Sequence, residues 1–185
     1  GISSSTNAGL QVATGSYVAF MDHDDALEPE AVYRVLDAAR HGCDLIYSDE
    51  VIIGQALDEI IQVVARPSFS YDYYISHPYF VHLVAVEKTL ACDIGGLDSN
   101  MAISMDVDFV LRVIERARSI AHIPVPLYRW RTHAQSVGHA KMDAVMAATR
   151  AALQRHHERT GRQVVVSDGP VFNTFRHDAP PTSAR

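Results

Sequence analysis

The residues best suited to chemistry in this chain are two carboxylates, Asp22 and Asp24, which stand one residue apart directly after the apolar run 17–21. Both can turn toward one hard divalent cation, which takes oxygen ligands and in nucleotide sites is shared with substrate phosphates. The apolar run reads as a buried strand, and open α/β sheets bind ligands at the carboxyl ends of their strands. The pattern therefore favours a site for a cation and a diphosphate. The same acids could instead cap a helix or satisfy turn amides.

One further acid, Asp106, has a candidate catalytic role. Asp106 falls in the first turn of a helix expected from Met105 onward, near the core side given by the spacing of its apolar residues. A carboxylate there can accept the proton of an attacking hydroxyl, although the helix N-terminus would stabilise it in any case. Asp25 and Asp108 are interpreted as structural, Asp25 because it lies closest to the helix that Pro29 opens.

The elements that must position these acids alternate between helix and strand, which is typical of an α/β fold. Periodicity predicts helices at 3–13 and 29–41, strands at 17–21, 44–48 and 81–86, and a hairpin of 51–53 with 60–64. Asp49 and Glu50, after the strand at 44–48, are expected in a solvated turn.

The later part of the chain adds one strand and a terminal unit. Alternation from Tyr128 predicts a strand with Arg129 and Arg131 on one face and Trp130 on the other, where Trp130 would serve as an aromatic platform or core residue. Beyond it we expect a helix at 138–159, a hairpin of 164–166 with 171–175, and a disordered tail.

Length, composition and charge limit the class of protein and the partners to be expected. The chain has 185 residues, enough for one domain with a real core, and its 48% apolar and 21% charged residues argue against disorder. A net charge of -6 without clusters of Lys and Arg disfavours a nucleic-acid partner. Cys43 and Cys92 are too few for a disulfide framework, which favours a reducing compartment. No apolar run has the length of a transmembrane segment.

Four blocks of sequence, in order, resemble the core of the inverting family 2 glycosyltransferases, which have the GT-A fold. The blocks are 7–9 with 13–25, then 95–98, 106–108, and 128–133 followed by Ser136. The resemblance implies that 1–137 is a partial GT-A domain, a Rossmann-like mixed sheet with flanking helices. Residues 138–185 are expected to pack on the same domain. Because the family's fold begins earlier, we expect an N-terminally truncated domain that lacks its first strands. An exposed sheet edge of that kind predicts self-association.

The resemblance also implies an activity: transfer of a sugar from a nucleotide-diphosphate donor to an acceptor hydroxyl on a carbohydrate or lipid-linked acceptor, with Mn²⁺ or Mg²⁺. A role in bacterial cell-surface polysaccharide or glycolipid synthesis follows from family habit, in the cytoplasm or at the inner membrane surface. The alternative is a noncatalytic carbohydrate-binding or interaction module.

Residue by residue, the resemblance makes Asp106 the base and Asp22, Asp24 and His133 the metal ligands. The donor is expected to contact Asn7, Gly9, Asp22, Asp24 and Arg131, and the acceptor region to include Gly95, Gly96 and Trp130. The paired glycines permit positive φ and a close approach, although a plain helix stop would leave the same pattern. Met105 departs from the family, which favours an acidic or amide residue there.

Overall fold

The computed structural model describes residues 1–132 and 141–179, and its centre is a six-stranded mixed sheet. Five strands run in the order β1-β5-β3-β6-β2, and β4 pairs with β3. Their bounds are β1 Tyr17–Phe20, β2 Ala26–Leu27, β3 Leu45–Ile53, β4 Ile60–Val64, β5 Val84–Glu87 and β6 Ile120–Arg131. The central pair β3 and β6 is parallel and the other pairs are antiparallel. The predicted α/β class with a mixed sheet is confirmed.

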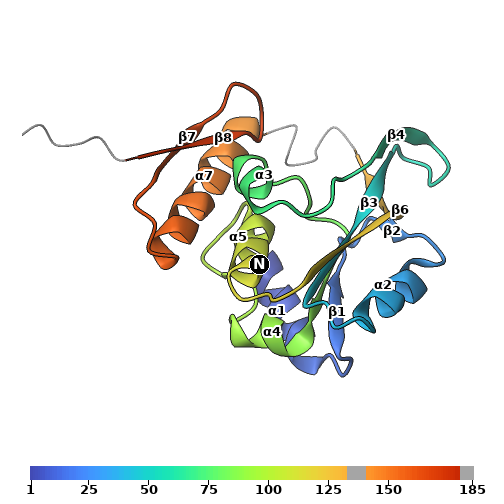
Figure 1. Ribbon diagram of the computed structural model, residues 1–185. Coiled ribbons are helices and arrows are strands. Elements are labelled where there is room, and N and C mark those ends of the chain that lie inside the picture. Colours follow the sequence, from blue (N-terminus) through green and yellow to red (C-terminus); the bar gives the residue numbers. More distant parts are fainter. Residues whose placement is uncertain (133–140, 180–185) are drawn as a thin grey trace, which may run out of the picture.

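Helices cover both faces of the sheet (Figure 1). Alternate residues of β3 point to opposite faces, so Leu45 and Tyr47 join one core cluster and Ile46 joins another. The first cluster contains residues of α1 (Ile2–Val12), α3 (Tyr71–Ser76), α4 (Lys88–Asp93) and α5 (Met105–Ile114), and the second contains residues of α2 (Ala31–Ala39). No helix in the described ranges combines the length and apolar character needed to cross a membrane.

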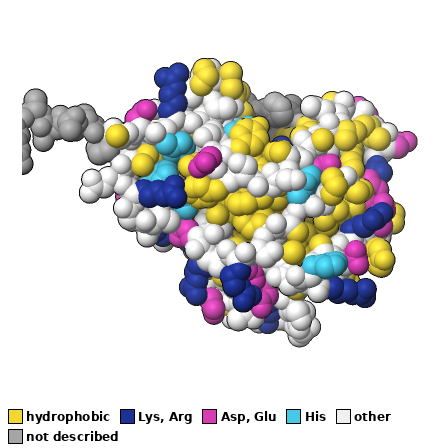
Figure 2. All heavy atoms as spheres, viewed as in Figure 1, with side chains coloured by type: hydrophobic (Ala, Val, Ile, Leu, Met, Phe, Trp, Pro, Cys, Tyr) yellow, Lys and Arg dark blue, Asp and Glu magenta, His cyan; other side chains and the backbone are white. Residues whose placement is uncertain are grey.

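The last described elements form a C-terminal unit, which consists of α7 (Met142–Arg159) and the hairpin of β7 (Val165–Asp168) with β8 (Phe175–Asp178). Leu153, Val166 and Phe175 belong to the same core cluster as α5, so this unit has no core of its own. Asp108, 2% exposed on α5, forms ion pairs with Arg155 and Arg159 of α7. Figure 2 shows histidine side chains gathered over this unit.

Three predictions about the elements need correction. Asp49 and Glu50 are buried rather than in a solvated turn, because β3 does not stop at Ser48 but continues through the middle of the sheet to Ile53. The second strand of the terminal hairpin starts at Phe175, so 169–174 form the connection and not 167–170. The strand expected at 81–86 is shorter and runs from Val84 to Glu87.

Candidate active site

The loop that follows β1 is fixed by one acid and one tyrosine. Tyr128 Oη donates a hydrogen bond to Asp25 Oδ2 at 2.6 Å and accepts one from the backbone N–H of Asp22 at 3.0 Å. Arg131 N donates to Asp25 Oδ1 at 2.7 Å. Asp25 is therefore structural as predicted, but its partners lie on β6 and not on the following helix. Burial raises the pKa of Asp25, and the bonds from Arg131 and Tyr128 offset part of that rise.

Asp22 and Asp106 line the same cavity, which has a volume of about 580 Å³. Its walls come from α1, β1, the segment leading into β5, and α5. The side chain of Asp22 is 61% exposed at the end of β1, so its oxygens are accessible to a ligand. Two acids distant in sequence are thus brought to one site by the pairing of β1 with β5 and the packing of α5 against them.

Asp106 occupies the first turn of α5, as the spacing predicts. Its Oδ1 accepts a hydrogen bond from the N–H of Val107 at 2.8 Å. Ser104, immediately before the helix, has the left-handed value φ 55°, which turns the chain sharply into α5. Met105 and Asp106 both line the cavity, so the residue that departs from the family contributes an apolar wall beside the candidate base.

His82 is a member of this site that the sequence reasoning missed. Its Nε2 lies 3.8 Å from Asp22 Oδ2, and its Nδ1 lies 3.6 Å from Glu50 Oε2. The imidazole stacks on Tyr128, with ring centroids 5.0 Å apart and planes within 10°. Burial lowers the pKa of His82, but Glu50 foremost, with Asp106 and Asp22, outweighs burial and raises it.

A sequence signal for His82 exists only once the strand pairing is known. Phe20 faces Val84 across the antiparallel pair of β1 and β5. Continuing that register by two residues brings His82 opposite Asp22. The sequence pattern predicts a solvated turn at Glu50, because it does not indicate how far β3 extends.

The predicted residues of β6 lie beside the same loop. Arg131 Nε donates to the carbonyl of Asp24 at 2.7 Å, and its Nη1 donates to the carbonyl of Gln55. Its guanidinium therefore already binds two backbone carbonyls next to the predicted metal ligands. Trp130 stacks against His82 with ring centroids 6.3 Å apart, so it borders the site through the imidazole.

The other predicted donor and acceptor residues meet where α1 packs against the turn after α4. Asn7 Nδ2 donates to the carbonyl of Leu97 and its Oδ1 accepts from the N–H of Leu97, both at 2.8 Å. Gly95 and Gly96 have φ 81° and φ 67°. Gly9 and Leu97 line the cavity, so this turn forms part of its wall.

The predicted metal set is only partly described. His133 lies outside the described residues. Within residues 1–132 and 141–179, no group of three or more His, Cys, Asp or Glu side chains is gathered closely enough to hold an ion. Two carboxylates still fit Mg²⁺ or Mn²⁺ when substrate phosphates supply further ligands. The exposed Asp22 and the partly exposed Asp24 can supply these two carboxylates.

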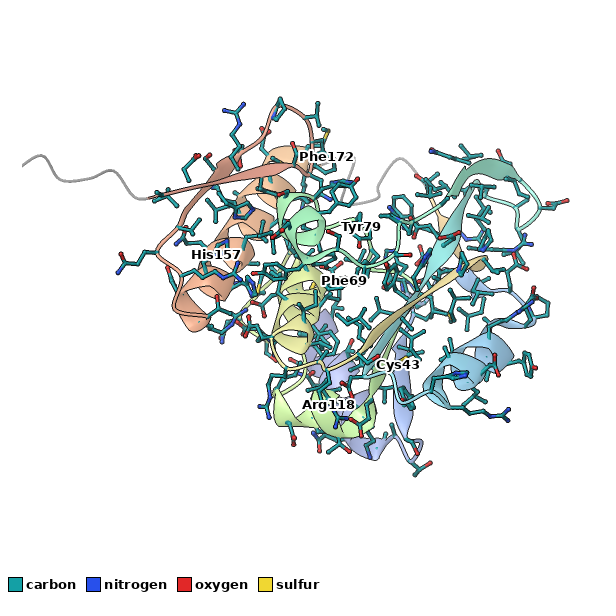
Figure 3. The ribbon with its side chains drawn as sticks, in the orientation of Figure 1. Cys43, Phe69, Tyr79, Arg118, His157 and Phe172 are labelled. Carbon is teal, nitrogen blue, oxygen red and sulfur yellow. The ribbon has the colours of Figure 1, made fainter. Side chains whose placement is uncertain are left out.

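A second hollow of about 510 Å³ lies between the loop before α3 and the start of β6. Phe69 and Arg118, labelled in Figure 3, are among its lining residues. His122 also lines it and is held by buried Asp49 at 2.8 Å. Neither Asp22 nor Asp106 is among the described residues that line it, so its geometry does not connect it to the site above.

Comparison with known proteins gives a family match over part of the chain. Residues 1–87 match the sequence profile of Glycosyl transferase family 2. The O-antigen biosynthesis protein RfbC of Myxococcus xanthus is 30% identical over 177 residues, which cover 93% of this chain and 14% of RfbC. The uncharacterized protein y4gI of Sinorhizobium fredii is 32% identical over 189 residues, which cover 95% of this chain and 20% of that protein. The chain thus spans a fifth or less of the length of these relatives.

Among solved structures, TarS 1–349 of S. aureus superposes with a TM-score of 0.57 at 17% identity, over 82% of this chain and 44% of that one. The same TarS fragment in complex with UDP-GlcNAc gives a TM-score of 0.56 over 79% of this chain and 45% of that one. At this identity the likeness establishes the fold alone, which this chain shares with the TarS 1–349 fragment.

Proposed function

Residues 1–87 belong to Glycosyl transferase family 2, and from that premise we propose that the chain transfers a sugar, with inversion, from a nucleotide-diphosphate donor to an acceptor hydroxyl. The observation that carries the proposal is the cavity shared by Asp22 and Asp106. Its volume of about 580 Å³ lies in the range of small-molecule sites. In this proposal Asp22 binds the cation and diphosphate, and Asp106 accepts the proton of the acceptor hydroxyl.

The roles of the side chains follow from inverting transfer. An acceptor hydroxyl attacks the anomeric carbon from the face opposite the diphosphate and releases its proton as the new bond forms. Asp106 takes that proton, and no covalent enzyme intermediate is needed. Asp22 and Asp24, with His133 as the resemblance implies, would hold Mn²⁺ or Mg²⁺. When bound, the cation neutralises charge that develops on the leaving diphosphate. Apolar Met105 and Phe109 line the same cavity and limit the access of water.

For the donor we propose a UDP-sugar, and for the setting the assembly of a cell-surface polysaccharide or glycolipid. The TarS complex with UDP-GlcNAc and the O-antigen role in the name of RfbC support this class. We also propose that the paired glycines and Trp130 belong to the acceptor side, since Gly96 adjoins the cavity-lining Leu97 and Trp130 stacks on cavity-lining His82.

The test compares turnover with binding in two variants. With Mn²⁺ and UDP-GlcNAc, Asp106→Asn is expected to bind UDP like the unchanged protein while its rate of transfer or donor hydrolysis falls by about 10²–10⁴-fold. Asp22→Asn is expected to weaken the Mn²⁺-dependent binding of UDP. The matched control is Asp37→Asn, an exposed carboxylate on α2, which should change neither quantity.

Two outcomes would overturn the proposal. One is Mn²⁺-dependent binding of UDP that Asp22→Asn leaves unchanged. The other is binding of an oligosaccharide, without any binding of UDP, GDP, CDP or dTDP and their sugars, which would identify the noncatalytic module instead.

A further inference from the structure

Behind His82, the buried carboxylate of Glu50 has one oxygen without a hydrogen-bond donor among the described residues. Glu50 is 4% exposed, and its Oε1 accepts a hydrogen bond from Arg66 Nη2. Its Oε2 has no hydrogen-bond partner among the described residues and lies 3.6 Å from Nδ1 of His82. A buried carboxylate oxygen without a hydrogen bond costs free energy, so the orientation of Glu50 Oε2 toward the imidazole calls for a functional explanation.

The imidazole is held in one orientation by its surroundings. Its ring lies flat on Tyr128, and Tyr128 in turn binds the backbone N–H of Asp22. Because an ionised carboxylate only accepts hydrogen bonds, Glu50 favours the proton on Nδ1. That arrangement leaves Nε2 toward Asp22 Oδ2, 3.8 Å away, at the cavity wall.

A carboxylate behind a histidine whose other nitrogen faces a second carboxylate is the arrangement found around protein-bound metals, where the outer acid fixes the tautomer and the ring orientation. Adjacent ligands of a Mn²⁺ or Mg²⁺ ion lie roughly 3 Å apart when the bonds are about 2.1 Å. The exposed Asp22 side chain can cover the remaining distance by a small rotation.

We propose that His82, oriented by Glu50, is a protein ligand of the divalent cation that Asp22 holds; the proposal rests on the proposed function, which supplies the cation. The cation site is then built by two strands, with Asp22 from the end of β1 and His82 from the residues that lead into β5. Asp24 and diphosphate oxygens would supply further ligands.

The test reads the ligand directly, with Mn²⁺ alone and Mn²⁺ plus UDP as probes. Electron spin echo modulation of bound Mn²⁺ is expected to show coupling to an imidazole nitrogen, and labelling the protein with ¹⁵N-histidine should change it. His82→Gln should remove the contribution of His82 to this coupling and raise the Mn²⁺ dissociation constant by about 10- to 100-fold. Glu50→Gln should keep the coupling and raise the constant by about tenfold. Thermal unfolding checks that each variant is folded, and His82→Asn is the second variant if His82→Gln is not.

The controls separate His82 from other histidines. His23→Gln alters the 98% exposed neighbour of Asp22, and His133→Gln alters the ligand that the resemblance implies. The proposal requires coupling to an imidazole nitrogen to persist when His23 and His133 are changed to Gln together, a result that does not depend on whether a His82 variant folds. Persistence of all nitrogen coupling in His82→Gln, or its loss in His23→Gln, would overturn the proposal while leaving the glycosyltransferase function intact. Failure of the unchanged protein to bind Mn²⁺ with UDP would overturn both.

Discussion

At the scale of single residues, Tyr128 connects the parts of the site. Its hydroxyl joins Asp25 to the backbone of Asp22, and its ring supports the imidazole of His82. Burial, followed by the bond to Asp25, raises the pKa of Tyr128, so its hydroxyl remains a hydrogen-bond donor at neutral pH. The geometry of the Asp22 loop thus depends on a side chain with no chemical role of its own.

Tyr128→Phe should therefore impair the site without removing any acid. The variant leaves Asp25 Oδ2 and the N–H of Asp22 without their partner, which is expected to destabilise the protein by about 1–2 kcal/mol. The loop loosens, and the Mn²⁺-dependent dissociation constant of UDP should rise by about tenfold, which calorimetric titration can measure. Tyr33→Phe, at a 63% exposed tyrosine of α2, is the control. Equal affinities in Tyr128→Phe and the unchanged protein would contradict this role of the hydroxyl.

At the scale of elements, α1 is joined to the turn after α4 by one amide side chain and one glycine. A Cβ on Gly96 would stand 2.3 Å from Asn7 Oδ1 and 3.3 Å from Leu10 Cδ2. Asn7 is in turn bound to Leu97 through both ends of its amide. The absence of a side chain at position 96 is therefore what lets α1 approach this wall of the cavity.

The paired glycines allow a matched comparison. Gly95→Ala introduces a side chain at φ 81° with no atom within 4 Å, so backbone strain alone should cost about 1 kcal/mol. Gly96→Ala adds a clash with Asn7 to similar strain at φ 67° and should cost about 2–3 kcal/mol in all. Urea unfolding measures both values. If the two variants are equally stable, the contact with Asn7 does not constrain this turn.

At the scale of the whole molecule, the C-terminal unit is attached through buried histidines as well as through apolar packing. His177 Nε2 donates to the carbonyl of Ile75 at 3.0 Å, so its Nδ1 accepts a hydrogen bond from His157 Nε2 at 2.8 Å when both rings are neutral. His157 is 1% exposed and its Nδ1 has no hydrogen-bond partner within the described part of the chain. Figure 3 shows His157 on the side of α7 that faces the hairpin.

This arrangement predicts that acid weakens the attachment of the unit. Burial, together with His177, His156 and Arg162, lowers the pKa of His157 to about 4. The unfolded chain, with an ordinary histidine pKa near 6.5, therefore binds more protons than the folded one between about pH 6.5 and 4. Stability should fall as the pH drops through that window, by on the order of 2 kcal/mol from this residue. His156, buried between Glu115 and Tyr71, also has a lowered pKa and adds to the trend.

Thermal unfolding at pH 7, 6 and 5 measures the effect. The midpoint should fall toward pH 5 in the unchanged protein and fall less in His157→Gln, because the variant lacks the buried titrating group. His41→Gln, at an exposed histidine, should follow the unchanged protein. One unfolding transition at each pH is also expected, since the unit shares the main core. Equal slopes in His157→Gln and the unchanged protein would contradict the account.

The sequence by itself determined the features that rest on local order. Alternation and helical spacing predicted the α/β class, β1, α5 and the place of Asp106 in its first turn, because these patterns follow from which face of a single element is buried. The spacing of Asp22 and Asp24 after a strand indicated a cation site for a similar reason, since a strand end and the acids that follow it are neighbours along the chain. Self-association through the sheet edge stays a prediction.

The features of the site that depend on pairing between distant segments are visible only in the tertiary structure. His82 reaches Asp22 through the register of β1 with β5, and Glu50 lies behind it because β3 continues into the middle of the sheet. Asp22 and Asp106 share a cavity because α5 packs beside β1, through contacts such as Phe20 with Phe109. The sequence pattern indicates neither which residues pair across β1 and β5 nor where β3 ends. The neighbours of the predicted acids could therefore be identified only in three dimensions.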